Sequence, residues 1–240
     1  MELKGARVLI TGGAKRVGAE IARAFAEAGS RIVLHCRNSR EEACALLSEI
    51  GGESAGHMIV EADLSHPENI PAFFQQIPDD LAVLVNNASV FRRKKMQEET
   101  LAEAKEQFDL NFWTPAELIR EFYRHSALHE LAVVNLLDQA IVRTPQNNFS
   151  YSLSKKALAE LTRCAALQYA PRMRVNGVAP GPVFPPPGME NSRMEKTLRT
   201  VPLGRPVNPH DLADSCVFLA GNSSITGSVL FADCGQSLVS

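Results

Sequence analysis

Short apolar segments alternate with helical patterns along the chain, and this alternation limits the fold more than any other feature. Runs rich in apolar and β-branched residues predict strands at 7–11, 31–35, 57–61, 81–85, 132–137, 174–178 and 229–231. Apolar positions at helical spacing predict helices at 18–28, 40–50, 69–76, 101–125, 151–169 and 209–220. Nearly all-apolar strands separated by helices are typical of a parallel sheet that is covered on both faces. The sequence therefore predicts an α/β fold, a doubly wound parallel sheet whose ligand crevice lies at the carboxyl ends of the strands.

Proline interrupts this pattern in two places. Pro115 lies inside the pattern at 101–125 and predicts a bend or break, because proline lacks an N–H and clashes with the preceding turn. Residues 180–188 contain five prolines and two glycines, so we expect no regular element there. We expect this segment to begin a loop, 180–200, that covers the substrate over the crevice.

Size and charge exclude several classes of protein. The chain has 240 residues, of which 45% are apolar, which is enough for one buried core, so we expect 1–240 to form one domain. A net charge of -2 gives no general attraction to nucleic acid or to an anionic membrane. No apolar run approaches the roughly 18 residues of a membrane span, and no signal-peptide pattern precedes the first strand. We expect a small-molecule substrate.

The cysteines and histidines indicate neither disulfides nor a metal. Five cysteines are an odd number, and no CxxC pair occurs, which favours reduced thiols in the cytoplasm. His125 and His129 have the spacing of metal ligands, but Ser126 stands where a metalloprotease helix has its glutamate, and no third ligand is evident. We therefore expect a cytoplasmic protein without a metal site.

The loop at 11–18, Thr-Gly-Gly-Ala-Lys-Arg-Val-Gly, joins the first predicted strand to the first predicted helix. At such a junction, backbone N–H groups and the positive end of the helix dipole bind phosphate. Arg16 adds a guanidinium that can bind a phosphate through two parallel hydrogen bonds. The loop therefore predicts a dinucleotide site; the alternative is an ordinary glycine-rich turn with Arg16 in solvent. The cofactor contacts expected here are Thr11, Gly12, Arg16, Val17 and Gly18.

Tyr151 and Lys155 are four residues apart in the predicted helix at 151–169, so a phenol and an ammonium share one face. An unperturbed tyrosine has a pKa near ~10, and a cation beside it favours the phenolate, which eases proton exchange at neutral pH. Together with the dinucleotide loop, this pair predicts hydride chemistry on a nicotinamide cofactor. The spacing alone is weak evidence, because such pairs often lie on a solvated helix face.

The end of the second predicted strand indicates which nicotinamide cofactor is used. An acid there would bind the ribose hydroxyls of NAD, and residues 35–39, His-Cys-Arg-Asn-Ser, contain none. Arg37, Ser39 and Arg16 offer donors for the additional phosphate of NADP, which a carboxylate would repel. The sequence therefore predicts NADPH, although Arg37 in solvent is an alternative. Asp63, which closes the third strand, can accept a hydrogen bond from the adenine amino group or instead cap the next helix.

Five motifs occur in a fixed order: the loop at 11–18, Asn-Asn-Ala-Ser at 86–89, Asn111, Tyr151 and Lys155. In this order, on predicted strand ends, the chain resembles the short-chain dehydrogenase/reductase family over essentially its whole length. The resemblance implies a single Rossmann-type domain in which Tyr151 donates a proton, Lys155 lowers the pKa of the tyrosine and holds the nicotinamide ribose, and Asn111 supports a water chain. It also implies a homo-oligomer, commonly a tetramer.

Asp138 indicates a branch of this family. Many members carry a serine about a dozen residues before the tyrosine, whereas here Asp138 lies thirteen residues before Tyr151. This carboxyl, and Arg16 in place of the middle glycine of TGxxxGxG, resemble the pteridine reductases. An ionised carboxylate would repel the oxyanion of a carbonyl reduction, but an Asp-Tyr-Lys relay can serve a ring C=N bond, which takes a hydride at carbon and a proton at nitrogen. The alternative is that Asp138 only orients a loop.

Phe91 matches an aromatic residue of pteridine reductases that holds the flat pterin against the nicotinamide. Stacking favours a planar heterocycle over a flexible acyl chain. A core phenylalanine is the alternative, because the chain has eleven. Ser89 would then hydrogen-bond the pterin or a cofactor phosphate. The basic run at 92–95 could attract an acidic substrate tail, such as the glutamate of a folate, but such runs are more often solvated loops.

The segment 176–181, Asn-Gly-Val-Ala-Pro-Gly, resembles the family segment behind the nicotinamide. Val183 stands near where a threonine often binds the carboxamide, so only backbone groups can make that contact. The remaining cofactor contacts that the resemblance implies are His35, Leu64, Asn87, Ala88, Ser89, Tyr151, Lys155, Pro180, Gly181 and Val183.

Three hypotheses about function follow from the sequence. The first is an NADPH-dependent pteridine reductase that acts on dihydropterin or dihydrofolate-type rings. The second is a short-chain carbonyl reductase, such as a 3-oxoacyl thioester reductase, and the missing serine argues against it. The third is a non-catalytic NADP-binding sensor, against which the intact Tyr151, Lys155 and Asn111 argue.

Overall fold

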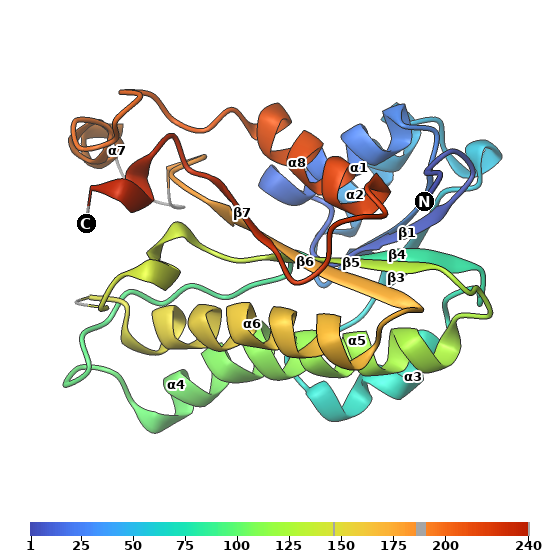
Figure 1. Ribbon diagram of the computed structural model, residues 1–240, viewed down its shortest axis with the longest axis horizontal. Coiled ribbons are helices and arrows are strands. Elements are labelled where there is room, and N and C mark those ends of the chain that lie inside the picture. Colours follow the sequence, from blue (N-terminus) through green and yellow to red (C-terminus); the bar gives the residue numbers. More distant parts are fainter. Residues whose placement is uncertain (146, 186–190, 240) are drawn as a thin grey trace.

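The computed structural model describes residues 1–145, 147–185 and 191–239, and its centre is a parallel seven-stranded sheet (Figure 1). The strand order is β3-β2-β1-β4-β5-β6-β7, and every neighbouring pair is parallel. All seven predicted strands are present, which confirms the doubly wound α/β fold. The strands are β1 (Arg7–Ile10), β2 (Arg31–Cys36), β3 (Met58–Glu61), β4 (Leu81–Asn86), β5 (Leu131–Leu136), β6 (Met173–Pro180) and β7 (Val229–Ala232).

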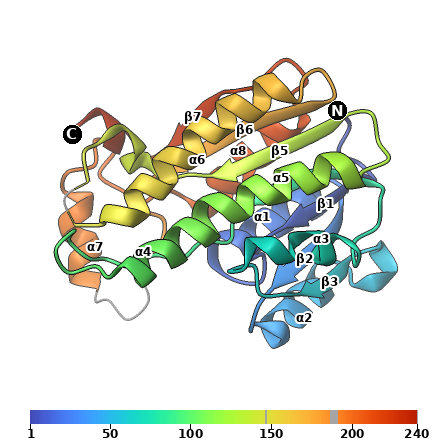
Figure 2. The same ribbon diagram turned by 90° about the horizontal axis from the view of Figure 1, so that it is seen from below.

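Helices cover both faces of the sheet (Figures 1 and 2). One face carries α1 (Arg16–Glu27), α2 (Arg40–Glu49) and α8 (Pro209–Gly221), and the other carries α3 (Ile70–Phe74), α4 (Leu101–Phe108), α5 (Thr114–His125) and α6 (Phe149–Gln168). Successive residues of β1 point to opposite layers, since Val8 and Ile10 join the core under α1 and α8 while Leu9 joins the core under α3 and α5. Burial on both faces explains why the strands are apolar at nearly every position.

The chain reverses its direction of growth between β1 and β4. From β1 it proceeds outward to β2 and β3, and then returns to β4 on the other side of β1. At such a switch point the loops after the two strands separate and open a crevice at their carboxyl ends. The loop after β1 and the segment after β4 therefore face each other across this crevice.

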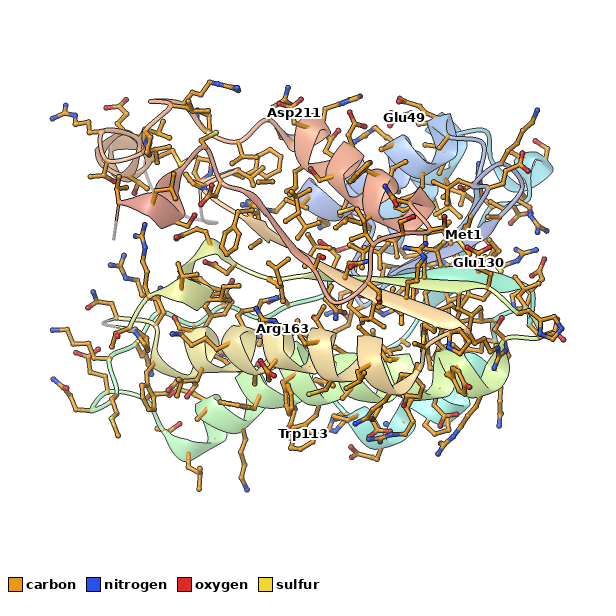
Figure 3. The ribbon with its side chains drawn as sticks, viewed as in Figure 1. Met1, Glu49, Trp113, Glu130, Arg163 and Asp211 are labelled. Atoms are coloured by element: carbon orange, nitrogen blue, oxygen red, sulfur yellow. The ribbon has the colours of Figure 1, made fainter. Side chains whose placement is uncertain are left out.

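The helix at 101–125 continues through the position of Pro115 instead of breaking there. Between α4 and α5 the residues Asp109–Trp113 form a π-helical turn, and Pro115 lies in the first turn of α5. The wider turn accommodates the proline without a break, so the expected interruption is a change of helical pitch. Asn111 in this turn is fully buried, whereas Trp113 lies on the outer side, away from the sheet (Figure 3).

The segment 180–200 is more regular than predicted. β6 extends through Pro180, and α7 (Asn191–Leu198) is a helix where we expected a loop. The many prolines at 180–188 led us to expect a loop throughout 180–200. The last of these prolines is Pro187, and the residues after it include good helix formers. Residues 186–190 of the expected proline-rich loop lie outside the described residues. Within the described part of the chain, no helix combines the length and apolar character that crossing a membrane requires.

Candidate active site

Thr11 fastens the end of β1 to the segment after β4. Its Oγ1 accepts hydrogen bonds from the N–H groups of Asn87 (2.9 Å) and Ala88 (3.0 Å) and donates to the carbonyl of Val85 (3.3 Å). The Asn87 amide donates in return to the carbonyls of Thr11 (2.8 Å) and Gly12 (2.9 Å). These bonds fix the two sides of the crevice relative to each other before any ligand binds.

His35 supports the phosphate loop from below. The Gly12 N–H donates to Nδ1 of His35 (3.0 Å), so Nε2 carries the proton and donates to the carbonyl of Ala62 (3.0 Å). Burial lowers the pKa of His35 to about 4, which keeps the ring neutral. The sequence predicted His35 as a cofactor contact; the ring lies in the wall of the crevice with both nitrogens already engaged, so its role in the structure is to position Gly12.

The loop leaves the N-terminus of α1 open to a ligand. Lys15, which precedes the helix, makes no capping hydrogen bond with its side chain. A Cβ at Gly18 would collide with the Gly12 carbonyl and the Asn87 side chain, and Gly12 itself has a φ of +61°. The close packing and the uncapped helix end fit a pyrophosphate, which would accept hydrogen bonds from the first N–H groups of the helix.

Arg16 occupies a conformation that usually belongs to glycine, with a φ of +53°. Its guanidinium lies over the ring of Phe184, with Cζ 5.2 Å from the ring centroid, and donates to the carbonyl of Pro185 (2.9 Å). In the structure Arg16 thus joins the phosphate loop to the segment after β6. Its predicted contact with a phosphate stays a prediction.

A cavity of about 480 Å³ occupies the crevice and is lined by most of the predicted cofactor residues. The predicted cofactor residues that do not line it are Thr11, Ser39, Tyr151, Lys155, Pro180, Gly181 and Val183. Five lining residues escaped the sequence prediction. Lys15, Ser65 and Val90 flank predicted residues in the sequence, whereas Glu106 and Leu110 reach the cavity only through the fold. The lining residues are Gly12, Lys15, Arg16, Val17, Gly18, His35, Arg37, Asp63, Leu64, Ser65, Asn87, Ala88, Ser89, Val90, Glu106 and Leu110.

Arg37 and Asp63, predicted for different parts of the cofactor, form an ion pair with each other. Nε of Arg37 lies 3.6 Å from Oδ2 of Asp63, and both side chains are about half exposed. Asp63 also accepts from the Ser65 N–H (2.9 Å) and hydroxyl (2.6 Å). These Ser65 hydrogen bonds, and then the Arg37 charge, lower the pKa of Asp63. A ligand here must compete with Asp63 for Arg37.

Asp138 and Tyr151 meet at the carboxyl end of β5. Tyr151, in the first turn of α6, donates its phenol proton to Oδ2 of Asp138 (2.9 Å). Oδ1 of Asp138 accepts from the Ala140 N–H (2.7 Å). Lys155 lies one turn further along α6 and donates to the carbonyl of Leu136 (2.7 Å). Three of the four predicted catalytic residues thus lie in one cluster, in which Lys155 is buried and Asp138 and Tyr151 are half-buried.

Burial shifts the pKa of each group in this cluster. It raises the pKa of Asp138 and raises that of Tyr151 well above its usual value, with the Asp138 charge adding to the second effect. It lowers the pKa of Lys155 to about 8, while the Asp138 charge acts in the opposite direction. Lys155 donates to the Leu136 carbonyl, and the expectation that it lowers the pKa of the phenol stays a prediction.

Asn111 connects the segment after β4 to the catalytic helix. Its Oδ1 accepts from the Ser89 hydroxyl and the Val90 N–H (both 2.9 Å). Its Nδ2 donates to the Val90 carbonyl (2.9 Å) and to the Ser154 hydroxyl (3.2 Å), and Ser154 donates to the Tyr151 carbonyl (2.7 Å). The π-helical turn therefore places a fully buried amide where it orients both Ser89 and α6. The water chain expected at Asn111 stays a prediction.

Phe91 faces the catalytic tyrosine. The two rings are nearly perpendicular, at 86°, and their centroids are 4.7 Å apart. Phe91 is 44% exposed, so the alternative of a core phenylalanine is wrong. The Phe91 ring therefore packs against the phenol that donates to Asp138.

A doubly wound sheet with an open phosphate loop, and a Tyr-Lys pair beyond the carboxyl end of a central strand, defines an NAD(P)-dependent oxidoreductase. A family model described as enoyl-(acyl carrier protein) reductase matches residues 12–237. The chain belongs to the short-chain dehydrogenase/reductase family, whose members use NAD(P). The expected homotetramer and cytoplasmic location stay predictions. Among the described residues, no group of three or more His, Cys, Asp or Glu side chains could hold a metal ion.

Similar proteins differ in their substrates. The crystal structure of FolM alternative dihydrofolate reductase 1 from Brucella canis, complexed with NADP, is 32% identical, has a TM-score of 0.92, and matches 99% of this chain and 96% of that one. The 3beta-hydroxysteroid dehydrogenase 1 of Eggerthella lenta is 29% identical over 99% of this chain and 95% of its own. The galactitol 2-dehydrogenase (L-tagatose-forming) of Cereibacter sphaeroides is 30% identical over 98% and 96%. Overall similarity therefore leaves the substrate open.

Proposed function

We propose that this protein is an NADPH-dependent pteridine reductase that reduces a ring C=N bond of dihydropterins or dihydrofolate. The observation that carries the proposal is the hydrogen bond from Tyr151 to Asp138 (2.9 Å). A carboxylate at this position opposes the oxyanion of a carbonyl reduction but can pass a proton to a ring nitrogen. The likeness to a solved alternative dihydrofolate reductase supports the same substrate class.

The chemistry divides between the cofactor and the chain. When bound, NADPH would supply the hydride that the ring carbon takes up as the C=N π bond is reduced. Asp138 and Tyr151 hold the proton that the ring nitrogen takes up, and water replaces it afterwards. Lys155, with a pKa of about 8, keeps a positive charge beside this pair at neutral pH and so favours loss of the proton. Phe91 offers its exposed face to the flat ring.

The choice of NADPH is supported by the cationic residues of the crevice. Lys15, Arg16 and Arg37 line the cavity, and β2 is followed by no acid before α2. Arg37 can exchange Asp63, its half-exposed partner, for a phosphate, because an exposed ion pair is weak. Asp63 then becomes available to the adenine amino group.

One substrate comparison tests the proposal. Purified protein with NADPH is offered dihydrobiopterin, dihydrofolate and an acetoacetyl thioester in parallel, and loss of the cofactor's absorbance is followed. We expect turnover of the pterins. Turnover of the thioester alone would establish the carbonyl reductase instead, and turnover of none would favour the non-catalytic sensor.

A variant sharpens this comparison. Asp138→Ser restores the serine that many family members carry, and it removes the carboxylate that opposes an oxyanion. We expect the ratio of thioester turnover to pterin turnover to rise in Asp138→Ser. An unchanged ratio would show that Asp138 does not select the substrate class.

A further inference from the structure

A second cavity, of about 610 Å³, lies beside the reactive pair. It lies between the segment after β5, the first turn of α6 and the loop that follows Phe91. Its wall is continuous with the reactive pair, because Gln139 follows Asp138 and Ser152 follows Tyr151. Its volume lies in the range of sites for small organic ligands. The lining residues are Arg93, Gln139, Ala140, Val142, Arg143, Thr144, Pro145, Asn147, Asn148 and Ser152.

The charge of this cavity is positive. Arg93 and Arg143 line it, and no aspartate or glutamate is among the described residues of its wall. The structure separates Arg93 from its neighbours in the basic run, since Arg92 is paired with Glu106 and Lys94 with Glu103. Among the described residues Arg93 has no carboxylate partner. Such a cavity favours an anion.

Unpartnered polar atoms point to a ligand with more than one kind of polar group. Five side-chain N or O atoms in the described residues are buried without a hydrogen-bond partner, and three of them belong to this wall: Nε of Arg143, Oε1 of Gln139 and Oδ1 of Asn148. Another nitrogen of Arg143 already donates to the carbonyl of Gln236. These atoms are buried in the absence of a ligand, so each side chain must rotate to meet one, and pairing then relieves the cost of a buried donor or acceptor without a partner. The guanidinium requires an acceptor, and the two amide oxygens require N–H or O–H donors.

We propose that this cavity binds the amide-linked, carboxylate-bearing tail of a folate-type substrate. A benzoylglutamate tail offers carboxylates to Arg93 and Arg143 and an amide N–H to Gln139 or Asn148. The inference rests on the proposed function, because the tail is attached to the ring that is reduced at Asp138 and Tyr151. It narrows that function to dihydrofolate-type substrates in preference to pterins with small neutral side chains.

Substrate preference in arginine variants tests this assignment. Arg93→Gln and Arg143→Gln are compared with Lys95→Gln, a matched control from the same basic run that does not line the cavity. We expect the ratio of kcat/KM for dihydrofolate to kcat/KM for dihydrobiopterin to fall about 10-fold in each arginine variant, as expected for a charge-assisted hydrogen bond. The control should keep the wild-type ratio. A ratio within one variant is insensitive to its fraction of folded protein, and Arg93 is exposed, so its replacement leaves the core intact. An unchanged ratio in both arginine variants would overturn the inference.

Binding of the tail alone separates the inference from the proposed function. Calorimetry with p-aminobenzoylglutamate requires no turnover, and we expect binding to the wild type that Arg93→Gln weakens and Lys95→Gln does not. If pterins are not reduced but this fragment binds in the expected pattern, the cavity assignment holds and the proposed function fails. If pterins are reduced but the fragment does not bind, the proposed function holds and the cavity assignment fails.

Discussion

The two ends of the crevice hold polar groups of different kinds: those at the β1–β4 end are neutral, and those at the β5–α6 end are ionisable. At the β1–β4 end, Thr11 and Asn87 are tied to backbone groups, and His35 stays neutral between two hydrogen bonds. At the β5–α6 end, Asp138 and Tyr151 are ionisable groups whose pKa burial has raised. The first end holds backbone N–H groups in a fixed shape, and the second holds a transferable proton away from water. Binding a phosphate requires only the shape, whereas moving a proton requires groups whose ionisation is costly to maintain.

Removing the phenol hydroxyl of Tyr151 should distinguish the functions of the two ends most clearly, because it should impair catalysis without impairing NADPH binding. Tyr151→Phe keeps the ring that packs against Phe91 but removes the hydroxyl that donates to Asp138. We expect kcat for the preferred pterin to fall by roughly 10²- to 10⁴-fold, the range of general acid–base catalysis. The affinity for NADPH, measured by quenching of protein fluorescence, should stay near that of the wild type. Retention of most of the activity would mean that Asp138 protonates the substrate without the tyrosine.

Because His35 is neutral in the folded protein, we expect the free energy of unfolding to depend on pH in the acid range. His35 has a pKa of about 4 in the folded protein, below the ordinary value of 6.5, so the unfolded chain binds a proton that the folded chain rejects. The free energy of unfolding therefore falls as the pH is lowered from about 6.5 to about 4, by about 3 kcal/mol in all. Above pH 6.5 this contribution is constant.

Denaturant unfolding of His35→Asn checks this expectation. Asparagine can still accept a hydrogen bond from Gly12 but cannot titrate. We expect the variant to lose less stability than the wild type between pH 7 and pH 4.5, whatever its stability at pH 7. Equal losses would assign the acid sensitivity to other groups.

Asp138→Asn should lower activity and raise stability together. We expect pterin turnover to fall by more than ~10-fold, because the variant can no longer pass a proton. The raised pKa of Asp138 means that the folded wild type pays for the carboxylate at high pH and is relieved of that cost as the pH falls through the raised pKa. The variant should therefore have the higher Tm at pH 8, with a smaller difference at pH 4.5. An unaffected rate would remove Asp138 from the mechanism, and an equal Tm difference at both pH values would contradict the burial cost.

The two ends also differ in how far the sequence foretells them. The phosphate loop follows from a local pattern, since a strand, a glycine-rich turn and a helix occur in succession at 7–28. Asp138 and Tyr151 were recognised by their spacing, but their altered acidity depends on burial, which the spacing does not contain. The pairing of Arg37 with Asp63 joins the ends of two different strands, and Glu106 reaches the crevice from a distant helix. Such contacts depend on three-dimensional distances that no local pattern encodes.

Replacing Arg37 should have the smallest effect of these substitutions, because Arg37 already has an ion-pair partner in Asp63. Its ion pair with Asp63 is 3.6 Å long and about half exposed, so exchanging the carboxylate for a phosphate changes the energy little. We expect Arg37→Gln to raise KM for NADPH about 5-fold and to leave KM for NADH near the wild-type value, since only NADPH carries the additional phosphate. Arg40→Gln is the matched control: Arg40 lies nearby and pairs with Glu61, but it does not line the cavity. Equal changes for both cofactors in Arg37→Gln, or the same change in Arg40→Gln, would mean that Arg37 does not contact the phosphate, and the preference for NADPH would then depend on Lys15 and Arg16, the other cations of the cavity wall.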